Sequence, residues 1–142
     1  YILENIPEYH MANEELNLVS QQYQKAIEAK AKEAETLYTA YQKAASSLNA
    51  SQRTQKEEAI IAKEKEAAEL RKKYFGPEGE MAQKEEALIA PIQNKIYEAV
   101  KQISQKNGYD AVIDRASATS IIFASPRIDI SNEVLSRLGY SN

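Results

Sequence analysis

Few side chains in this sequence are of the types that carry acid–base or nucleophilic chemistry. The chain of 142 residues holds one histidine, His10, and no cysteine. Nucleophilic catalysis needs a nucleophile within reach of a positioned base, and thiolate metal sites need cysteine. A lone histidine beside the start of a helix is usually a solvated surface residue. We therefore expect no catalytic residues and no cofactor, and the sequence does not predict an enzyme.

The 21 acidic residues are the remaining candidates for a metal site. Most of them alternate with lysine or arginine, as in residues 57–73, which is typical of a solvated helical face with charge pairs one turn apart. Asp110 and Asp114 would share one face of a strand but stand about 13 Å apart, too far to converge on one ion. The run Gly76-Pro77-Glu78-Gly79 lacks the lysine and the preceding strand of a phosphate-binding loop. The sequence thus predicts no metal and no phosphate site.

The nine tyrosines are more informative than the titratable groups. Tyr23 and Tyr41 fall on a predicted helix at positions where packing in a seam between helices is the simpler explanation. Tyr38 directly follows Leu37 and cannot fully share its face. We therefore expect Tyr38 to present an apolar ring with a polar hydroxyl to solvent or to a bound protein.

The overall composition favours long helices over a compact mixed core. Ala, Glu, Lys, Gln and Leu dominate residues 11–106, and the whole chain holds four glycines and four prolines. The net charge of −3 offers little attraction to phosphates, so no nucleic-acid partner is expected. No apolar run approaches the ~20 residues that cross a bilayer.

The first long helix is predicted from about Met11 to Leu48. Apolar positions there alternate at spacings of four and three, which is the heptad pattern of a seam between two helices. Two members of the seam are polar, so it is imperfect. The predicted seam comprises Leu16, Ser20, Tyr23, Ile27, Lys30, Ala34, Leu37, Tyr41, Ala44 and Leu48.

The stretch Ser46–Thr54 is predicted to be the tip of a helical hairpin. Its serines and asparagine compete with the helical backbone for hydrogen bonds and favour turns and caps. Ser51 is the predicted N-cap of the returning helix. Asn49-Ala50-Ser51 also matches a glycosylation acceptor, but the turn-and-cap reading is preferred.

The second arm is predicted from about Thr54 to Lys106, interrupted or bent between Tyr74 and Glu80 by two glycines and a proline. Pro91 should add a milder kink. The distal half has a weak stripe of Ile61, Glu64, Ala68, Arg71 and Phe75. The proximal half has a stronger one of Ile89, Ile92, Ile96, Ala99 and Ile103.

The ends of the chain are predicted to form a small base. Tyr1–Tyr9 reads as a short helix stopped near Pro7. Asn107-Gly108 ends the second arm, two short strands follow, and Asp129 or Ser131 caps a last amphipathic helix. The strands are Tyr109–Arg115 and Thr119–Ala124. The apolar face of the last helix is formed by Ile130, Val134, Leu135 and Leu138.

The predicted fold class is therefore α+β, mainly α, with a long antiparallel coiled-coil hairpin (residues 11–106, tip near 46–54) on a small β-containing oligomerisation body (residues 1–10 and 107–142). The whole chain is predicted to be one domain. Two short strands and one short helix make too small a core to stand alone. Because an apolar strand edge invites pairing with another chain, oligomerisation is the expected solution.

Three stretches carry a recognisable family pattern. They are Tyr1–Tyr9, Phe75–Glu80 and, most specifically, Pro91–Leu138, where GYDAVID precedes the second strand and Asp129-Ile130-Ser131 leads into the last helix. Together they resemble the Skp/OmpH family of periplasmic chaperones. The resemblance covers essentially the whole chain, and its Ala-rich arms are its least specific part.

The resemblance implies an ATP-independent holdase that binds unfolded outer-membrane β-barrel proteins in the periplasm, after removal of a signal peptide, and prevents their aggregation. It implies a homotrimer with a shared β-body and projecting hairpins. On this basis the expected body residues are Tyr109, Val112, Ile113, Ile121, Ile122 and Phe123. The expected client-binding residues, whose division between client and seam the sequence leaves open, are Leu37, Tyr38, Leu48, Ile60, Ile61, Tyr74 and Phe75.

Two departures from the family pattern qualify these expectations. The family has a short strand before the first helix, whereas this sequence starts at or just before that helix, so trimerisation of this exact chain is left open. The best-known members are strongly basic, whereas this chain is acidic, so only weak contact with a membrane surface is expected. The alternative function is a structural or adaptor hairpin protein of the cell envelope, and a prefoldin-like chaperone ranks below both.

Overall fold

The computed structural model describes residues 1–140, and it is mostly helical. Its long helices are α1 (Pro7–Ala44), α2 (Ala50–Phe75) and α3 (Glu80–Asn107), and α4 (Ser131–Leu138) is short. A short 3-10 turn, η1 (Leu3–Asn5), precedes α1, while η2 (Ala45–Ser47) follows α1 and η3 (Pro126–Ile128) lies between α3 and α4. The chain divides into two compact units, one of Tyr1–Glu14 with the chain from Glu86 onward, and one of Glu15–Glu85.

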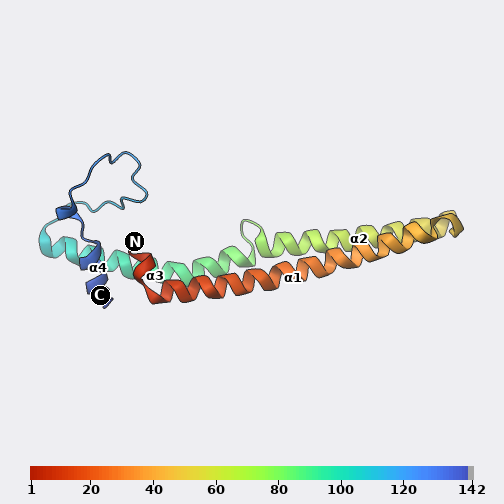
Figure 1. Cartoon of the computed structure of the whole chain (residues 1–142), viewed down its shortest axis with the longest axis horizontal. Coiled ribbons are helices and arrows are strands. Elements are labelled where there is room, and N and C mark those ends of the chain that lie inside the picture. The colour runs from red at the N-terminus through yellow and green to blue at the C-terminus, as the bar shows by residue number, and fades with distance from the viewer. Residues whose placement is uncertain (141–142) are drawn as a thin grey trace. The chain divides into compact units, whose positions relative to one another are not determined.

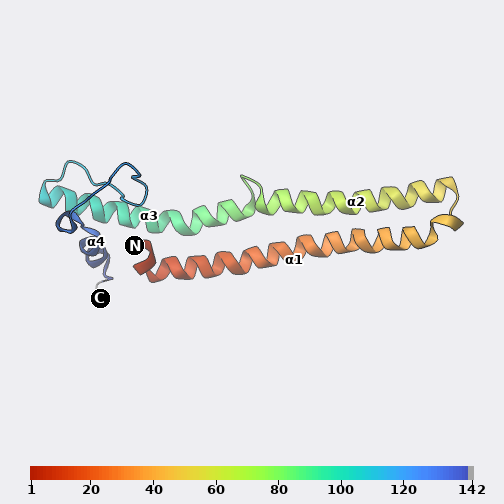
Figure 2. The same cartoon turned by 45° about the horizontal axis from the view of Figure 1, so that its top comes forward.

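The second unit is a helical hairpin in which α1 and α2 run antiparallel (Figures 1 and 2). Every residue of the predicted seam, from Leu16 to Leu48, is buried or half-buried, although α1 ends at Ala44, before the predicted Leu48. Ile27 is only 1% exposed and Ala34 6% exposed. The heptad spacing therefore identified the packed face of α1 correctly, including its polar members.

The weak stripe predicted for α2 is wrong by one residue. Ile61, Glu64, Ala68, Arg71 and Phe75 are all exposed. The buried or half-buried set starts one position earlier, with Ile60, Lys63, Ala67, Leu70 and Tyr74. A one-residue shift rotates a helical stripe by about 100°, so the predicted stripe lies on the flank of the hairpin instead of in its seam.

The tip of the hairpin is capped by an asparagine. The Asn49 side chain accepts a hydrogen bond from the Gln52 backbone N–H at 2.8 Å, and the Gln52 side chain accepts one from the Asn49 N–H at 3.0 Å. This reciprocal pair is a capping box. The prediction of Ser51 as N-cap is wrong, because α2 begins at Ala50 and Ser51 already lies in its first turn.

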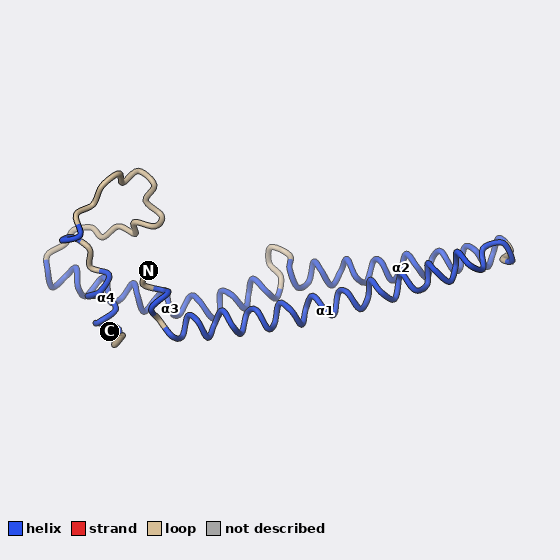
Figure 3. The backbone as a smooth tube through the Cα atoms, viewed as in Figure 1, coloured by secondary structure: helices blue, strands red, loops and turns tan. Residues whose placement is uncertain are grey.

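The predicted interruption of the second arm is confirmed. A loop separates α2 from α3, drawn in tan between blue helices in Figure 3. The loop is closed by backbone hydrogen bonds from Gly76 to Lys72 and from Gly79 to Gly76, both 2.9 Å. A Cβ on Gly79 would lie 2.8 Å from the Lys73 carbonyl oxygen, so glycine is needed for this tight closure. By contrast, α3 continues through Pro91.

The first unit has its core around α3 and α4. Ile92 and Leu135 are buried with Ile6 and Ala12, while Val134 is buried with Ala99 and Ile103. They include five of the apolar positions predicted for the last helix and for proximal α3, and the other four pack against them half-buried: Ile89, Ile96, Ile130 and Leu138. The unit is also joined by polar contacts, since Tyr140 donates to Glu8 at 2.5 Å and Arg137 donates to Gln102 at 2.6 and 2.9 Å.

Helix ends in this unit follow mostly from local signals. Pro7 is the first residue of α1, where its missing N–H costs nothing, so the helix starts four residues before the predicted Met11. Gly108 has a positive φ of 71° just after α3 ends at Asn107, as predicted. The N-cap of α4 is Ile130, with no side-chain cap bond, so the prediction of Asp129 or Ser131 as the cap is wrong, although the Asp129 side chain accepts from the Ser131 N–H at 2.8 Å.

The predicted strands Tyr109–Arg115 and Thr119–Ala124 do not form within residues 1–140, so the β-containing body is not confirmed. Their backbone bonds are local turns, such as Ala118 N–H to the Asp114 carbonyl at 3.1 Å. A strand needs a partner ladder for its backbone groups. Two short segments next to a turn provide too little pairing in a single chain to hold a sheet.

Candidate functional site

The structure separates the predicted client-binding residues into two sets. One set is buried or half-buried in the seam of the hairpin, where it packs α1 against α2: Leu37, Leu48, Ile60 and Tyr74. The other set is exposed: Tyr38, Ile61 and Phe75. The exposed set is available to a bound protein without opening the hairpin, which is a distinction that the sequence left open.

Two grooves lie on the exposed flank of the hairpin between α1 and α2. The first, which we call the alanine groove, has a volume of about 350 Å³. Its floor is formed by Ala31, Ala34, Ala67 and Ala68, and its remaining lining by Glu35, Tyr38, Glu64 and Arg71. The small side chains leave a hollow that Tyr38 bounds with an exposed ring.

The second groove, called the Phe75 groove, has a volume of about 420 Å³. It is lined by Ser20, Gln21, Gln24, Arg71 and Phe75. Arg71 lines both grooves. On α2 the groove residues Glu64, Ala68, Arg71 and Phe75 are spaced by four, three and four, which places them on one face of the helix.

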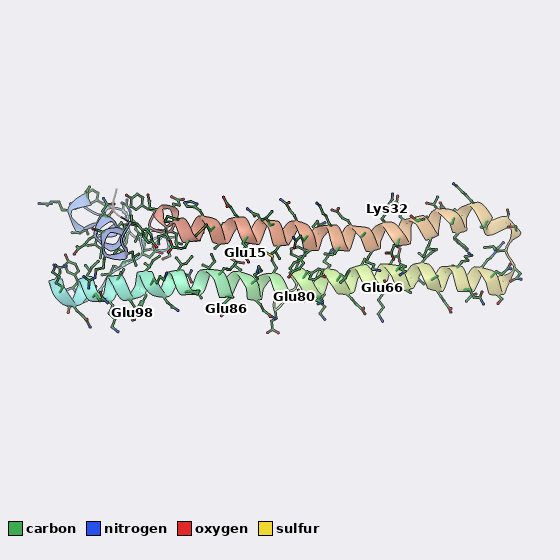
Figure 4. All side chains as sticks on the ribbon, turned by 90° about the horizontal axis from the view of Figure 1, so that it is seen from below. Glu15, Lys32, Glu66, Glu80, Glu86 and Glu98 are labelled. Atoms are coloured by element: carbon green, nitrogen blue, oxygen red, sulfur yellow. The ribbon has the colours of Figure 1, made fainter. Side chains whose placement is uncertain are left out.

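A closed ring of ion pairs crosses the seam at mid-hairpin. Lys30 contacts Glu33 and Glu66, both at 3.3 Å, and Lys63 contacts the same two carboxylates at 3.0 and 3.2 Å. Hydrogen bonds from Lys63 and then Lys30 lower the pKa of both Glu33 and Glu66. Figure 4 labels Glu66 in this region, with Lys32 on the side of α1 away from α2. The ring explains how Lys30 and Lys63 occupy seam positions.

An aromatic cluster joins the two sides of the helix break. The Tyr23 and Tyr74 rings stack at 4.0 Å, and Phe75 meets Tyr23 edge-on at 6.2 Å. The Tyr23 hydroxyl donates to Glu80 at 2.9 Å, and Lys73 pairs with the same carboxylate at 3.2 Å. The bond to Glu80 raises the pKa of the Tyr23 hydroxyl, and the same bond lowers the pKa of Glu80. Sequence reasoning placed Tyr23 in the seam but missed its tie to the start of α3.

A second candidate surface, the apolar loop, is the irregular segment of residues 109–125 in the first unit. It carries all six residues predicted for the oligomerisation body. Ile122 is 98% exposed and Phe123 81% exposed, Ile121 is half-buried, and the other three are exposed: Tyr109, Val112 and Ile113. Exposed apolar patches of this kind are typical of interaction surfaces.

His10 takes a structural part. Its Nε2 donates to the backbone carbonyl of Glu4 at 2.7 Å, next to η1. Within residues 1–140, no three His, Cys, Asp or Glu side chains gather closely enough to hold a metal ion. In the same part of the chain, no helix combines the length and the apolar character that crossing a membrane requires.

Comparison with known proteins indicates which family the chain is similar to. Residues 1–138 match the family model described as outer membrane protein (OmpH-like). The chain is also similar to the chaperone protein Skp of Yersinia enterocolitica, with 33% identity over 97 residues, which is 68% of this chain and 56% of that protein. The chain therefore spans little more than half the length of that relative.

Proposed function

Since this chain belongs to the family described as outer membrane protein (OmpH-like), we propose that it is an ATP-independent holdase chaperone of the periplasm. Its partners are unfolded outer-membrane β-barrel proteins, which it keeps from aggregating. The observation that carries the proposal is a hairpin whose seam is filled while Tyr38, Ile61 and Phe75 stay exposed on its flank. The similarity to a chaperone, Skp, supports the same function.

Weak apolar contacts suit this task. A holdase must bind many segments of an unfolded chain and release them without chemical energy, so no single contact should be strong. Ala-floored grooves and single exposed aromatic rings provide small apolar areas, at roughly 25 cal/mol per Å² buried. Summed over several hairpins, such contacts give useful avidity through effective concentration.

The apolar loop supplies the assembly surface in this proposal. Tyr109, Val112, Ile113, Ile121, Ile122 and Phe123 pair with the same residues of two other copies and form a β-body in a homotrimer. Residues 1–10 and 107–142 make up this body, and residues 11–106 project from it as the hairpin. The exposure of Ile122 and Phe123 in the single chain supports the proposal, because a monomer gains nothing from it.

Aggregation suppression tests the function directly. A denatured outer-membrane β-barrel protein is diluted out of urea with and without this chain, in the absence of ATP, and light scattering is followed. We expect scattering to be suppressed at about one trimer per client. An assembled trimer that leaves scattering unchanged would overturn the proposal. Solution mass checks the assembly, since a homotrimer has three times the mass of the chain.

A spacer or adaptor of the cell envelope is the second candidate function. It is favoured by the ion-pair ring and the stacked tyrosines, which tie α1 to α2 along the hairpin. A spacer needs stiff arms, whereas a holdase needs arms that adapt to the client. Amide hydrogen exchange separates the two functions: uniformly slow exchange along α1 and α2 favours a spacer, and fast exchange toward the tip favours a holdase.

A further inference from the structure

The alanine groove and the Phe75 groove meet at Arg71, so together they form one track along the flank of the hairpin. We define this track by Tyr38 and Phe75 near its ends and by Arg71, one helical turn from Phe75, where the two grooves meet. Tyr38 and Phe75 are 49% and 39% exposed, so an aromatic ring is available near each end. The track lies wholly within the unit Glu15–Glu85.

The length of the track sets the kind of occupant. From Gln21 to Tyr38, α1 rises about 25 Å at about 1.5 Å per residue. This distance matches about eight residues of extended chain at roughly 3.3 Å per residue. An extended segment of this length lays every second side chain against the alanine-lined flank and the next ones toward solvent.

The positive charge of Arg71, where the two grooves meet, indicates which side chains the occupant carries there. The Arg71 guanidinium makes no ion pair with another residue of the described chain. Of the two acids in the lining, Glu35 is paired with Lys32 at 3.0 Å. Glu64 stands two helical turns from Arg71, about 10.5 Å along the axis. A carboxylate of the bound segment that lies where the grooves meet would therefore face the unpaired Arg71 guanidinium. Guanidinium groups bind carboxylate acceptors well.

We propose that this track binds an extended segment of an unfolded protein, about eight residues long, with aromatic or large apolar side chains toward both ends and an acidic side chain opposite Arg71. The proposal rests on the chaperone function proposed above and names the client segment that one hairpin holds. Because every second side chain of an extended segment faces the same way, the apolar ends and the acid that contact the track stand at alternate positions, as where Asp or Glu replaces one residue on the apolar face of a strand.

Two synthetic octapeptides test the selectivity on the full-length chain. Both carry a phenylalanine near each end, and they differ only at the centre, with aspartate in one and lysine in the other. By fluorescence anisotropy we expect the aspartate peptide to bind about two- to fivefold more tightly, the size of one exposed charge pair. Equal binding of the two peptides would overturn the proposal.

Matched variants locate the site. Arg71→Glu should reverse the preference between the peptides, whereas Lys72→Glu, the same charge change on an exposed neighbour outside both grooves, should leave it unchanged. A photo-crosslinking residue at Gln21 should capture the aspartate peptide, whereas one at Gln22, exposed but outside the grooves, should not. The proposal would be overturned if both charge changes altered the preference equally, or if the crosslinking residues at positions 21 and 22 captured the peptide equally.

Three further outcomes separate this inference from the function on which it rests. If crosslinks from position 21 join two copies of the chain when no peptide is present, the track is an interface between copies and the proposal fails. If the wild-type chain suppresses aggregation of a β-barrel protein but shows no peptide preference, the holdase function stands, and the proposal that the track binds this segment is overturned. Peptide preference without suppression would instead overturn the holdase function.

Discussion

The rings of Tyr23 and Tyr74 lie parallel, 4.0 Å apart with 1° between their planes, directly before the break between α2 and α3. Tyr23 comes from α1 and Tyr74 from the last turn of α2. The Tyr23 hydroxyl also reaches Glu80, the first residue of α3. One side chain of α1 thus fixes the ends of both helices that flank the loop.

Removing the Tyr23 hydroxyl should loosen the start of α3 without disturbing the stack. In Tyr23→Phe the ring remains, but the Glu80 carboxylate loses one of its two partners and keeps only Lys73. We expect faster amide hydrogen exchange at residues 80–84 and little change in α2. In Tyr23→Ala, loss of the stack should also speed exchange in the last turn of α2. Identical exchange in wild type and Tyr23→Phe would show that the Glu80 bond does not hold the break.

The ion-pair ring should make the hairpin sensitive to acid. The pKa values of Glu33 and Glu66 lie below the usual 4.5 in the folded chain because Lys63 and Lys30 donate to them. A depressed carboxyl pKa contributes stability that is fully present above the unfolded value and is lost as pH falls through the folded value. We therefore expect the thermal midpoint to hold from neutral pH to about 5 and to fall below about 4.5.

The double variant Glu33→Gln/Glu66→Gln tests this dependence by circular dichroism over the same pH range. Its midpoint should be lower than wild type at neutral pH and should fall less steeply in acid. Glu35→Gln is the control, since Glu35 pairs only with Lys32 of its own helix. An acid profile of the double variant that runs parallel to wild type would mean that other carboxylates cause the acid loss.

Sequence reasoning succeeded where one periodic signal or one backbone constraint decides the outcome. The seam of α1 follows a heptad repeat over its whole length, so two polar members did not obscure it. Gly76 and Gly79 allow a closure that any Cβ would obstruct, and Gly108 takes a positive φ after α3. These features are local, and local sequence determines them.

Predictions failed where the outcome depends on a partner element. On α2, Ile61 and Phe75 looked like seam residues because they are apolar, yet the seam takes Lys63, whose stem packs while its ammonium reaches Glu33 on α1. The predicted strands have no ladder partner in one chain. The sequence did not predict the flank grooves, because they are lined by alanines of two helices that only the antiparallel alignment brings together.

The adjacent residues Ile60 and Ile61 provide a matched test of the shifted seam. Ile60 is 7% exposed and Ile61 62% exposed. Truncating a buried isoleucine typically costs about 2–5 kcal/mol, whereas an exposed one costs roughly 0.5 kcal/mol or less. We expect Ile60→Ala to lower the free energy of unfolding, near the lower end of that range because the seam has only two helices. Ile61→Ala should leave the stability unchanged.

The same pair separates stability from client binding. Under the proposed function, Ile61→Ala should weaken the suppression of aggregation at unchanged stability, whereas Ile60→Ala should act through unfolding alone. Urea titration measures the first quantity and light scattering with a denatured β-barrel protein the second. A larger loss of stability in Ile61→Ala than in Ile60→Ala would overturn the shifted seam.

The apolar loop offers the sharpest test of assembly, because its most exposed residues make no visible contribution to the fold of one chain. Ile122→Asp combined with Phe123→Asp should reduce the solution mass to that of the monomer, since placing two carboxylates in a shared apolar interface is costly. Helix content should be retained, because α1–α4 pack without these side chains. Leu18→Asp, at a comparably exposed position on α1, should leave the mass unchanged. If the double variant keeps the same mass as wild type, residues 109–125 are not the surface through which copies associate.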